Sequence, residues 1–198
     1  MTIFKKENQK LFHIHIPKTG GTSLVNEMKE LGWKISLFDK ADSSVHYNVP
    51  PQHMTKEQYT NFVDVKNIPN FAIVRDPWER TVSEFVWREK TNNFQKINEW
   101  FNKMLDELKS KTLQNHFAPQ KDFIHESTKV FRYKDYNSLI EFINKFEPNY
   151  RNVMRANKIS LYVLPKQQDV FSKTTIDKWL ELYRDDQILF DNIKQNKK

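Results

Sequence analysis

The segment "HIHIPKTGGTSL", residues 13–24, holds two of the three glycines of the 198-residue chain, side by side at Gly20 and Gly21. Before it, "LFHIHI" (residues 11–16) alternates apolar side chains with histidines, which predicts a strand. After it, apolar residues recur at helical spacing from Thr22, and Gly32 predicts the end of that helix. A glycine pair between a strand and a helix lets the backbone turn tightly and direct its N–H groups at an anion. We therefore predict a phosphate-binding loop here.

The rest of the chain alternates strand and helix patterns. Strands are predicted at "NFAIVRD" (70–76) and "KVFRY" (129–133), and helices at 99–109, 138–146 and, as one or two helices, 175–193. The helix after the second strand begins with Asp76 as N-cap, Pro77 at its first position and Glu79 completing a capping box. We predict a single α/β domain over residues 1–198, a P-loop-like parallel sheet flanked by helices.

Composition narrows the class of partner. The net charge is +7, but the lysines are scattered and often stand beside Asp or Glu, so we expect an anionic ligand and no nucleic acid. The chain has no cysteine. The amino-terminal stretch "MTIFKKENQK" is too polar for a signal peptide and no apolar run reaches the length of a membrane span. We therefore expect a cytoplasmic protein with no transmembrane segment.

The order of residues in the loop separates it from the common nucleotide-triphosphate loop. In that motif the lysine follows the glycines, whereas Lys18 precedes them. "PKTGGTS" followed by "VRDPWERTVSEF" resembles the two cofactor signatures of sulfotransferases that use 3′-phosphoadenosine 5′-phosphosulfate (PAPS). The resemblance is closest to the carbohydrate branch, which includes heparan sulfate 2-O-sulfotransferases and small bacterial relatives. "QHMTKEQY", "NHFAPQKDFI" and "YRDDQILF" extend it over most of the chain.

The resemblance implies how the donor is bound. Lys18 would reach the bridging oxygen between phosphate and sulfate, and the second signature would hold the 3′-phosphate. The donor-binding residues implied are Lys18, Thr19, Gly20, Gly21, Thr22, Ser23, Arg75 and Ser83. The structural alternative gives Arg75 a surface ion pair and Ser83 a place on a helix face. Sulfuryl transfer is an in-line displacement that needs positioning and a cation at the leaving oxygen, so no metal is expected.

The acceptor hydroxyl needs a base, and the chain offers six histidines. We favour His53, because it precedes a helix start with Thr55 as N-cap and Gln58 completing a capping box, where an imidazolium is disfavoured. A structural role for His53 and a catalytic role for His46 stay open. Packing or an inter-strand hydrogen bond is expected for His13 and His15, and His125 is read as solvated. Two glutamates near the second signature, Glu79 and Glu84, are weaker candidates for the base.

The acceptor site is the least determined part. His116 and Gln120 are predicted to contact the acceptor, with a structural role as the alternative, and Arg155 and Lys158 are possible contacts to the nucleotide. A saccharide hydroxyl is the expected acceptor from the resemblance alone. Two other functions stay open: a P-loop-type nucleotide or small-molecule kinase, which would need Mg²⁺, and a non-catalytic protein that binds PAPS or its product 3′-phosphoadenosine 5′-phosphate (PAP).

Overall fold

The structure is a computed structural model that describes residues 1–37, 49–61, 63–109, 115–151 and 163–193. His46, Arg155 and Lys158 lie outside the described residues. The predictions made for these positions therefore stay predictions.

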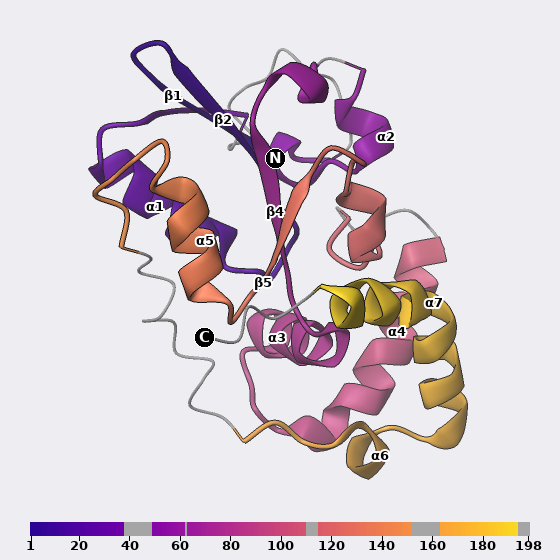
Figure 1. Ribbon diagram of the computed structural model, residues 1–198. Coiled ribbons are helices and arrows are strands. Elements are labelled where there is room, and N and C mark those ends of the chain that lie inside the picture. The colour runs from indigo at the N-terminus through magenta and orange to yellow at the C-terminus, as the bar shows by residue number, and fades with distance from the viewer. Residues whose placement is uncertain (38–48, 62, 110–114, 152–162, 194–198) are drawn as a thin grey trace.

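A five-stranded sheet forms the centre of the fold, in the order β3-β1-β2-β4-β5 (Figure 1). The strands are β1 (Thr2–Lys6), β2 (Gln9–Ile14), β3 (Lys34–Ser36), β4 (Asn70–Val74) and β5 (Lys129–Arg132). Strands β2, β4 and β5 pair in parallel, while β1 is antiparallel to both β2 and β3. Four strands thus run in one direction and β1 runs against them, so the prediction of a purely parallel sheet was wrong at this strand.

The reversed strand results from a hairpin at the amino terminus. Lys6 pairs with Gln9 across a two-residue turn, and Glu7 in that turn has a φ of 52°. Two strands joined by so short a turn can only pair antiparallel. The sequence pattern missed β1 because lysines occupy the hairpin tip and make the segment look like a polar terminus.

Both faces of the sheet are covered, as the alternation of side chains on β4 requires. Phe71 and Ile73 pack with α1 (Gly21–Glu30) and α5 (Tyr136–Ile143) on one face. Ala72 and Val74 pack on the other face with the short helix α2 (Lys56–Tyr59) and the single turns η2 (Val65–Asn67) and η4 (Gln120–Phe123). Every residue of β4 is buried, which is typical of a central strand with helices on both sides.

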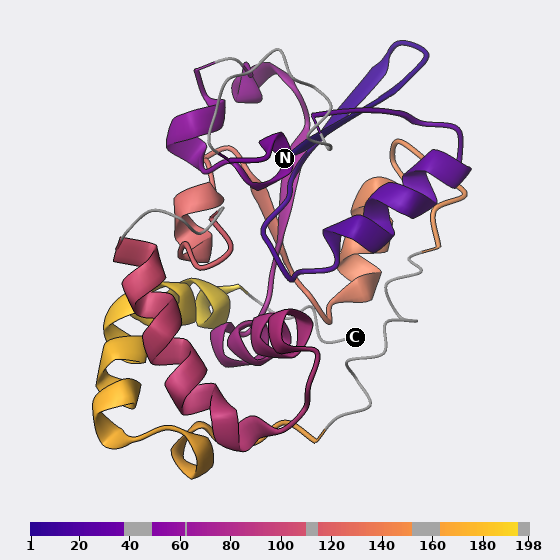
Figure 2. The ribbon, with the colours of Figure 1, turned by 180° about the vertical axis from the view of Figure 1, so that it is seen from behind.

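A second helical layer lies beyond the carboxyl end of β4 (Figures 1 and 2). It consists of α3 (Pro77–Glu89), η3 (Phe94–Lys96), α4 (Ile97–Lys109), α6 (Gln167–Val170) and α7 (Lys173–Asn192). Its core is aromatic, with Phe85, Trp100, Phe101, Phe117 and Trp179 buried together. The last predicted segment forms one helix, α7, whose final residues also pack under the sheet.

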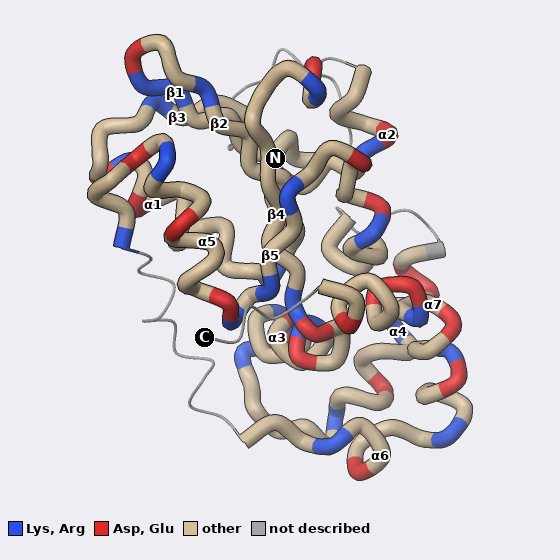
Figure 3. Tube along the Cα trace, in the orientation of Figure 1, with Lys and Arg blue, Asp and Glu red and all other residues tan. Residues whose placement is uncertain are grey.

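Charged residues of both signs are mixed along the described elements. Figure 3 shows acidic and basic positions side by side on the β1–β2 hairpin and along α7. In the part of the chain that the structure describes, no helix is both long enough and apolar enough to cross a bilayer.

Candidate active site

The two adjacent glycines are needed for two different reasons. Gly20 precedes α1 with a φ of 88°, a left-handed conformation that glycine adopts without strain. Gly21 begins the helix, and a Cβ placed on it would lie 2.2 Å from Cδ2 and 2.3 Å from Nε2 of His15. A side chain there would therefore collide with a buried imidazole. One glycine permits the turn, and the other lets a histidine pack against the backbone.

The loop delivers backbone N–H groups to the start of α1. Lys18 also has a positive φ, 68°, and the Thr19 hydroxyl donates to the Ile16 carbonyl at 2.8 Å, which closes the turn. The first N–H groups of a helix have no partner within it, and the helix dipole adds positive potential there. The first turn of α1, described in full, contains no acidic residue. This terminus is suited to an anion.

The second motif packs directly against the loop. Arg75 follows β4, and its Nη1 donates to the Lys18 carbonyl at 3.4 Å. The guanidinium also lies 4.6 Å from the centre of the Tyr133 ring and its Nε is 3.4 Å from the Glu79 carboxylate. The predicted N-cap is confirmed, because the Asp76 carboxylate accepts from the Glu79 backbone N–H at 2.9 Å. The end of β4 and the phosphate loop thus form one unit.

Ser83 lies on α3, one turn beyond Arg80. It is 1% exposed, and its hydroxyl has no hydrogen-bond partner among the described residues. Arg80 shares this face of the helix and donates from Nε to the Pro17 carbonyl of the loop at 3.2 Å. A buried hydroxyl without a partner is rare in folded proteins. An anion held between α3 and the loop would satisfy it.

Lys18 is the cation that the loop itself contributes. Its Nζ lies 4.7 Å from the centre of the Trp87 ring, and burial lowers the pKa of Lys18 to about 8. The carboxylate of Glu84 opposes this shift, while nearby cations including Arg75 reinforce it. A partly desolvated ammonium interacts more strongly with a negative charge than one in water does.

Four histidines form a continuous column from the core to this site. His13 stacks on Phe71 with ring centroids 4.9 Å apart, and His15 stacks on His13 at 5.4 Å. His15 meets His53 edge to face at 5.3 Å, and His53 meets His116 edge to face at 4.4 Å. The packing role predicted for His13 and His15 is confirmed. No sequence pattern indicated that His53 and His116 would touch.

His53 ends the turn η1 (Pro51–His53), next to the predicted cap. The capping box at Thr55 and Gln58 is present, with the Thr55 N–H donating to Gln58 Oε1 at 2.9 Å. The pKa of His53 is held well below its usual range, which agrees with the neutral form predicted. The main cause is burial, and electrostatic interactions with His116 and with the amino terminus add to it. The helix it precedes has only four residues, so its dipole adds little.

His116 reaches the site from the segment before η4. Its Nδ1 lies 3.0 and 3.1 Å from the two carboxylate oxygens of Glu84, and its ring stacks on Trp87 with centroids 5.3 Å apart. Glu84 also accepts from Arg88 Nε at 2.6 Å. Burial alone would raise the pKa of Glu84, but the hydrogen bonds from His116 and Arg88 outweigh it, and the pKa lies below its usual value.

Comparison with known proteins gives the family. A model described as "Sulfotransferase family" matches residues 1–191. This chain belongs to the sulfotransferase family. The family supports sulfuryl transfer in general, with a sulfonate donor and a hydroxyl-bearing acceptor. No curated protein and no solved structure gives a significant match.

Gln120, for which acceptor contact or a structural role was predicted, bonds to the backbone of Arg75 in this sulfotransferase. It is fully buried, and its amide accepts from the Arg75 N–H at 2.9 Å and donates to the Arg75 carbonyl at 2.8 Å. We therefore assign Gln120 to holding the backbone of Arg75.

Two buried residues of the site were not singled out in the sequence. Arg80 joins the loop to the His116 segment, since its Nη2 donates to the carbonyls of His116 and Ala118 at 2.8 and 3.0 Å. Asp186 on α7 accepts from the backbone N–H groups of Gln120 and Lys121 and lies 3.9 Å from Arg80. Both belong to motifs that carry the resemblance, "VRDPWERTVSEF" and "YRDDQILF", which is the signal that was available.

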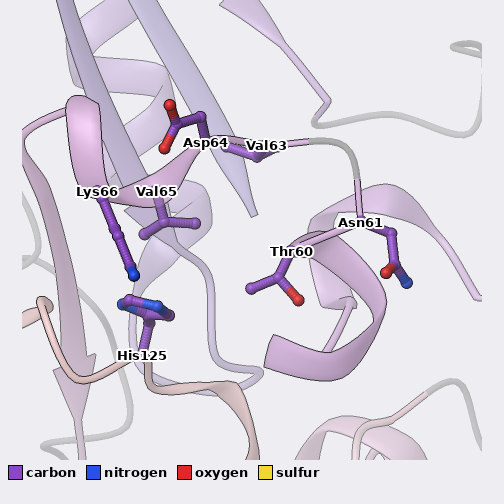
Figure 4. Close-up of a pocket in the computed structure, with 7 residues that line it drawn as sticks. All are labelled: Thr60, Asn61, Val63, Asp64, Val65, Lys66 and His125. Carbon is purple, nitrogen blue, oxygen red and sulfur yellow. The ribbon is translucent and has the colours of Figure 1, made fainter.

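A cavity of about 360 Å³ lies near the amino-terminal end of β4, away from the loop that joins β2 to α1 (Figure 4). Its lining is Thr60, Asn61, Val63, Asp64, Val65, Lys66 and His125. Lys66 precedes β4 whereas Arg75 follows it, so the length of the strand separates this cavity from the phosphate loop. Ligands of such sheets bind at the carboxyl ends of the strands. In the described part of the chain, no group of three or more His, Asp or Glu side chains is arranged to hold a metal ion.

Proposed function

We propose that this protein transfers the sulfuryl group of PAPS to an acceptor hydroxyl, with a saccharide as the acceptor. The observation that carries the proposal is the contact between the two motifs, in which Arg75 donates to the carbonyl of Lys18 at 3.4 Å. A donor with phosphate groups at both its 3′ and 5′ positions needs two anion sites at a fixed separation. The phosphate loop and the end of β4 supply two such sites on one rigid unit.

The chain's own residues divide the work of donor binding. The backbone of residues 19–22 and the hydroxyls of Thr22 and Ser23 hold the 5′-phosphosulfate at the start of α1. Arg75 and Ser83 hold the 3′-phosphate. Arg75 suits this role because its planar guanidinium binds phosphate through two parallel hydrogen bonds. The unpartnered hydroxyl of Ser83 supports its assignment.

The proposed transfer step uses no metal. The acceptor oxygen forms a bond to sulfur as the bond from sulfur to the 5′-phosphate oxygen breaks, and PAP leaves. Lys18 stabilises the charge that develops on the departing oxygen. The acceptor proton passes to a histidine. We place this base in the pair formed by His53 and His116, whose rings are 4.4 Å apart.

Trp87 supports a saccharide as the acceptor. Trp87 is 46% exposed, although its ring stacks on His116. The centre of the ring lies 4.7 Å from Lys18 Nζ. The C–H face of a sugar ring is apolar and fits an exposed aromatic ring, while its hydroxyls reach the polar groups beside it. An exposed tryptophan next to the proposed base and the proposed leaving-group cation offers both surfaces.

Calorimetric titration with PAP tests the donor site. We expect metal-independent binding that is selective over ATP, and a loss of about 10- to 100-fold in affinity for Arg75→Ala. Arg75→Lys keeps the charge but loses the fork, so it should bind with intermediate affinity. Arg184→Ala, an exposed arginine on α7, is the matched control and should bind like the wild type.

The same titration can reject the proposal. A preference for ATP with Mg²⁺ would favour the kinase alternative, and no PAP binding would exclude a PAPS-dependent activity. Binding without transfer to any acceptor would favour the non-catalytic alternative. Transfer of radiolabelled sulfate from PAPS to a panel of saccharides, phenols and tyrosine peptides then tests the acceptor class, and labelling confined to phenols or peptides would overturn the saccharide assignment.

A further inference from the structure

Glu84 is a buried acid that donor binding does not use. It is 2% exposed, yet it stays ionised because His116 and Arg88 both bond to it. A buried, ionised carboxylate destabilises the folded state unless it is paired and hydrogen-bonded. One of these partners, Arg88, lies on the same helix. The other is His116, one of the two candidate bases.

We propose that Glu84 is a positioning residue that holds His116 in the tautomer whose Nε2 takes the acceptor's proton, which makes His116 the catalytic base. The proposal rests on the sulfuryl transfer proposed above. It concerns the residues of this chain alone, and the tautomer can be measured without a known acceptor.

The tautomer follows from the chemistry of the two partners. An ionised carboxylate has only acceptor oxygens, so the contacts at 3.0 and 3.1 Å require the proton of His116 to sit on Nδ1. In a neutral imidazole the other nitrogen, Nε2, then carries a lone pair and accepts a proton. As Nε2 takes the acceptor's proton, the imidazolium that forms is stabilised by the carboxylate at Nδ1. The same logic orients the histidine of a serine protease.

Packing fixes both partners. The Glu84 carboxylate is held by Arg88 Nε at 2.6 Å, one helical turn along α3. The His116 ring stacks on Trp87 with an interplanar angle of 14°, and it also meets the His53 ring edge to face. Arg80 holds the carbonyl of His116 at 2.8 Å, so the backbone is fixed as well. The ring has one orientation that satisfies all these contacts.

His53 lacks the equivalent arrangement. Its Nδ1 is buried and has no hydrogen-bond partner among the described residues. A proton received by His53 would create a charge that burial and the neighbouring cations, among them Lys18 and Arg80, all oppose. His53 therefore packs against the His116 ring and holds it in place. His116 is the group that takes the proton.

Nitrogen and carbon NMR of histidine-labelled protein reports the tautomer directly. The His116 signals are assigned by their disappearance in His116→Gln. We expect the wild type to show the Nδ1–H form of His116, and Glu84→Gln to show a mixture, because an amide can donate or accept. Glu89→Gln, an exposed glutamate at the end of the same helix, is the matched control and should leave the tautomer unchanged.

Turnover and binding separate this role from a purely structural one. Glu84→Gln should lower kcat by about 10²-fold or more while KM for PAPS and the affinity for PAP stay within about threefold, because positioning acts on the proton acceptor alone. An Nε2–H tautomer in the wild type, or an unchanged kcat in Glu84→Gln, would overturn the proposal. Failure of the wild type to bind PAP would count against the proposed function instead, since the tautomer is measured independently of it.

Discussion

The inner and outer halves of the histidine column contain the same side chain in opposite settings. His13 and His15 are buried among aromatic rings, and His15 packs against the Gly21 backbone. His53 and His116 meet at the site, where His116 contacts Glu84 and Trp87. The inner pair contributes to aromatic packing, and at the outer end Glu84 bonds to His116. Under the proposed function, the environment of each imidazole decides which one takes the proton.

The largest expected effect is the loss of the outer histidine. His116→Ala should lower kcat by about 10²- to 10⁴-fold with PAP affinity retained, because a general base contributes that much. His125→Ala, whose ring bonds to Ser127 and Glu126 at the other edge of the sheet, is the control. A His116→Ala variant with wild-type kcat, measured by release of PAP with a known acceptor, would remove the distinction between the two halves.

The inner half should make the protein sensitive to acid. Burial lowers the pKa of His13 to about 3, from 6.5 in the unfolded chain, so the unfolded state binds the extra proton between these values. The contribution of neutral His13 to the free energy of unfolding is fully present above pH 6.5. It falls by about 1.4 kcal/mol for each pH unit from there down to about pH 3. His13→Phe should reduce this slope without changing kcat. Urea unfolding at pH 8 and pH 4.5 measures it, and equal slopes in both proteins would contradict the assignment.

The contact between Gly21 and His15 can be tested by a double-mutant cycle. Gly21→Ala should lower the free energy of unfolding by about 1–3 kcal/mol, because its Cβ overlaps the His15 ring. His15→Ala should relieve much of that loss, which a coupling energy would report. Gly32→Ala is strained by its φ of 85° but has open space around its Cβ, so it should show no coupling to His15. Additive changes at Gly21 and His15 would show that they do not touch.

Lys18 gives the smallest effect, on binding at alkaline pH. With its pKa at about 8, Lys18 loses its charge above that pH, and PAP affinity should fall by about tenfold for each further pH unit. Lys18→Arg, which keeps its charge, should flatten this dependence. Calorimetry between pH 7 and pH 9.5 is the measurement, and a profile in Lys18→Arg identical to the wild type would assign the titration to another group.

Local patterns in the sequence predicted most of the elements. The alternation at residues 11–16, the buried run at β4 and the caps at Asp76 and Thr55 each depend on neighbours within a few positions, and the structure confirms them. The hairpin strand β1 was missed because its lysine-rich tip conceals a strand that only pairing with β2 stabilises. The burial of Gln120 against Arg75 likewise depends on tertiary packing, since nothing in a polar segment indicates it.

By itself the sequence determined the order of strand, loop and helix, the position of the two motifs proposed to bind phosphate, and the need for glycine at the turn. Those features depend on backbone conformation and short-range spacing. Only the tertiary structure decided that Arg75 lies against Lys18, that Gly21 is required by a histidine ring, and that Glu84 and His116 meet from positions 32 residues apart. Such contacts arise from the packing of α3 and the His116 segment beyond β4, and no local pattern specifies the distance between them.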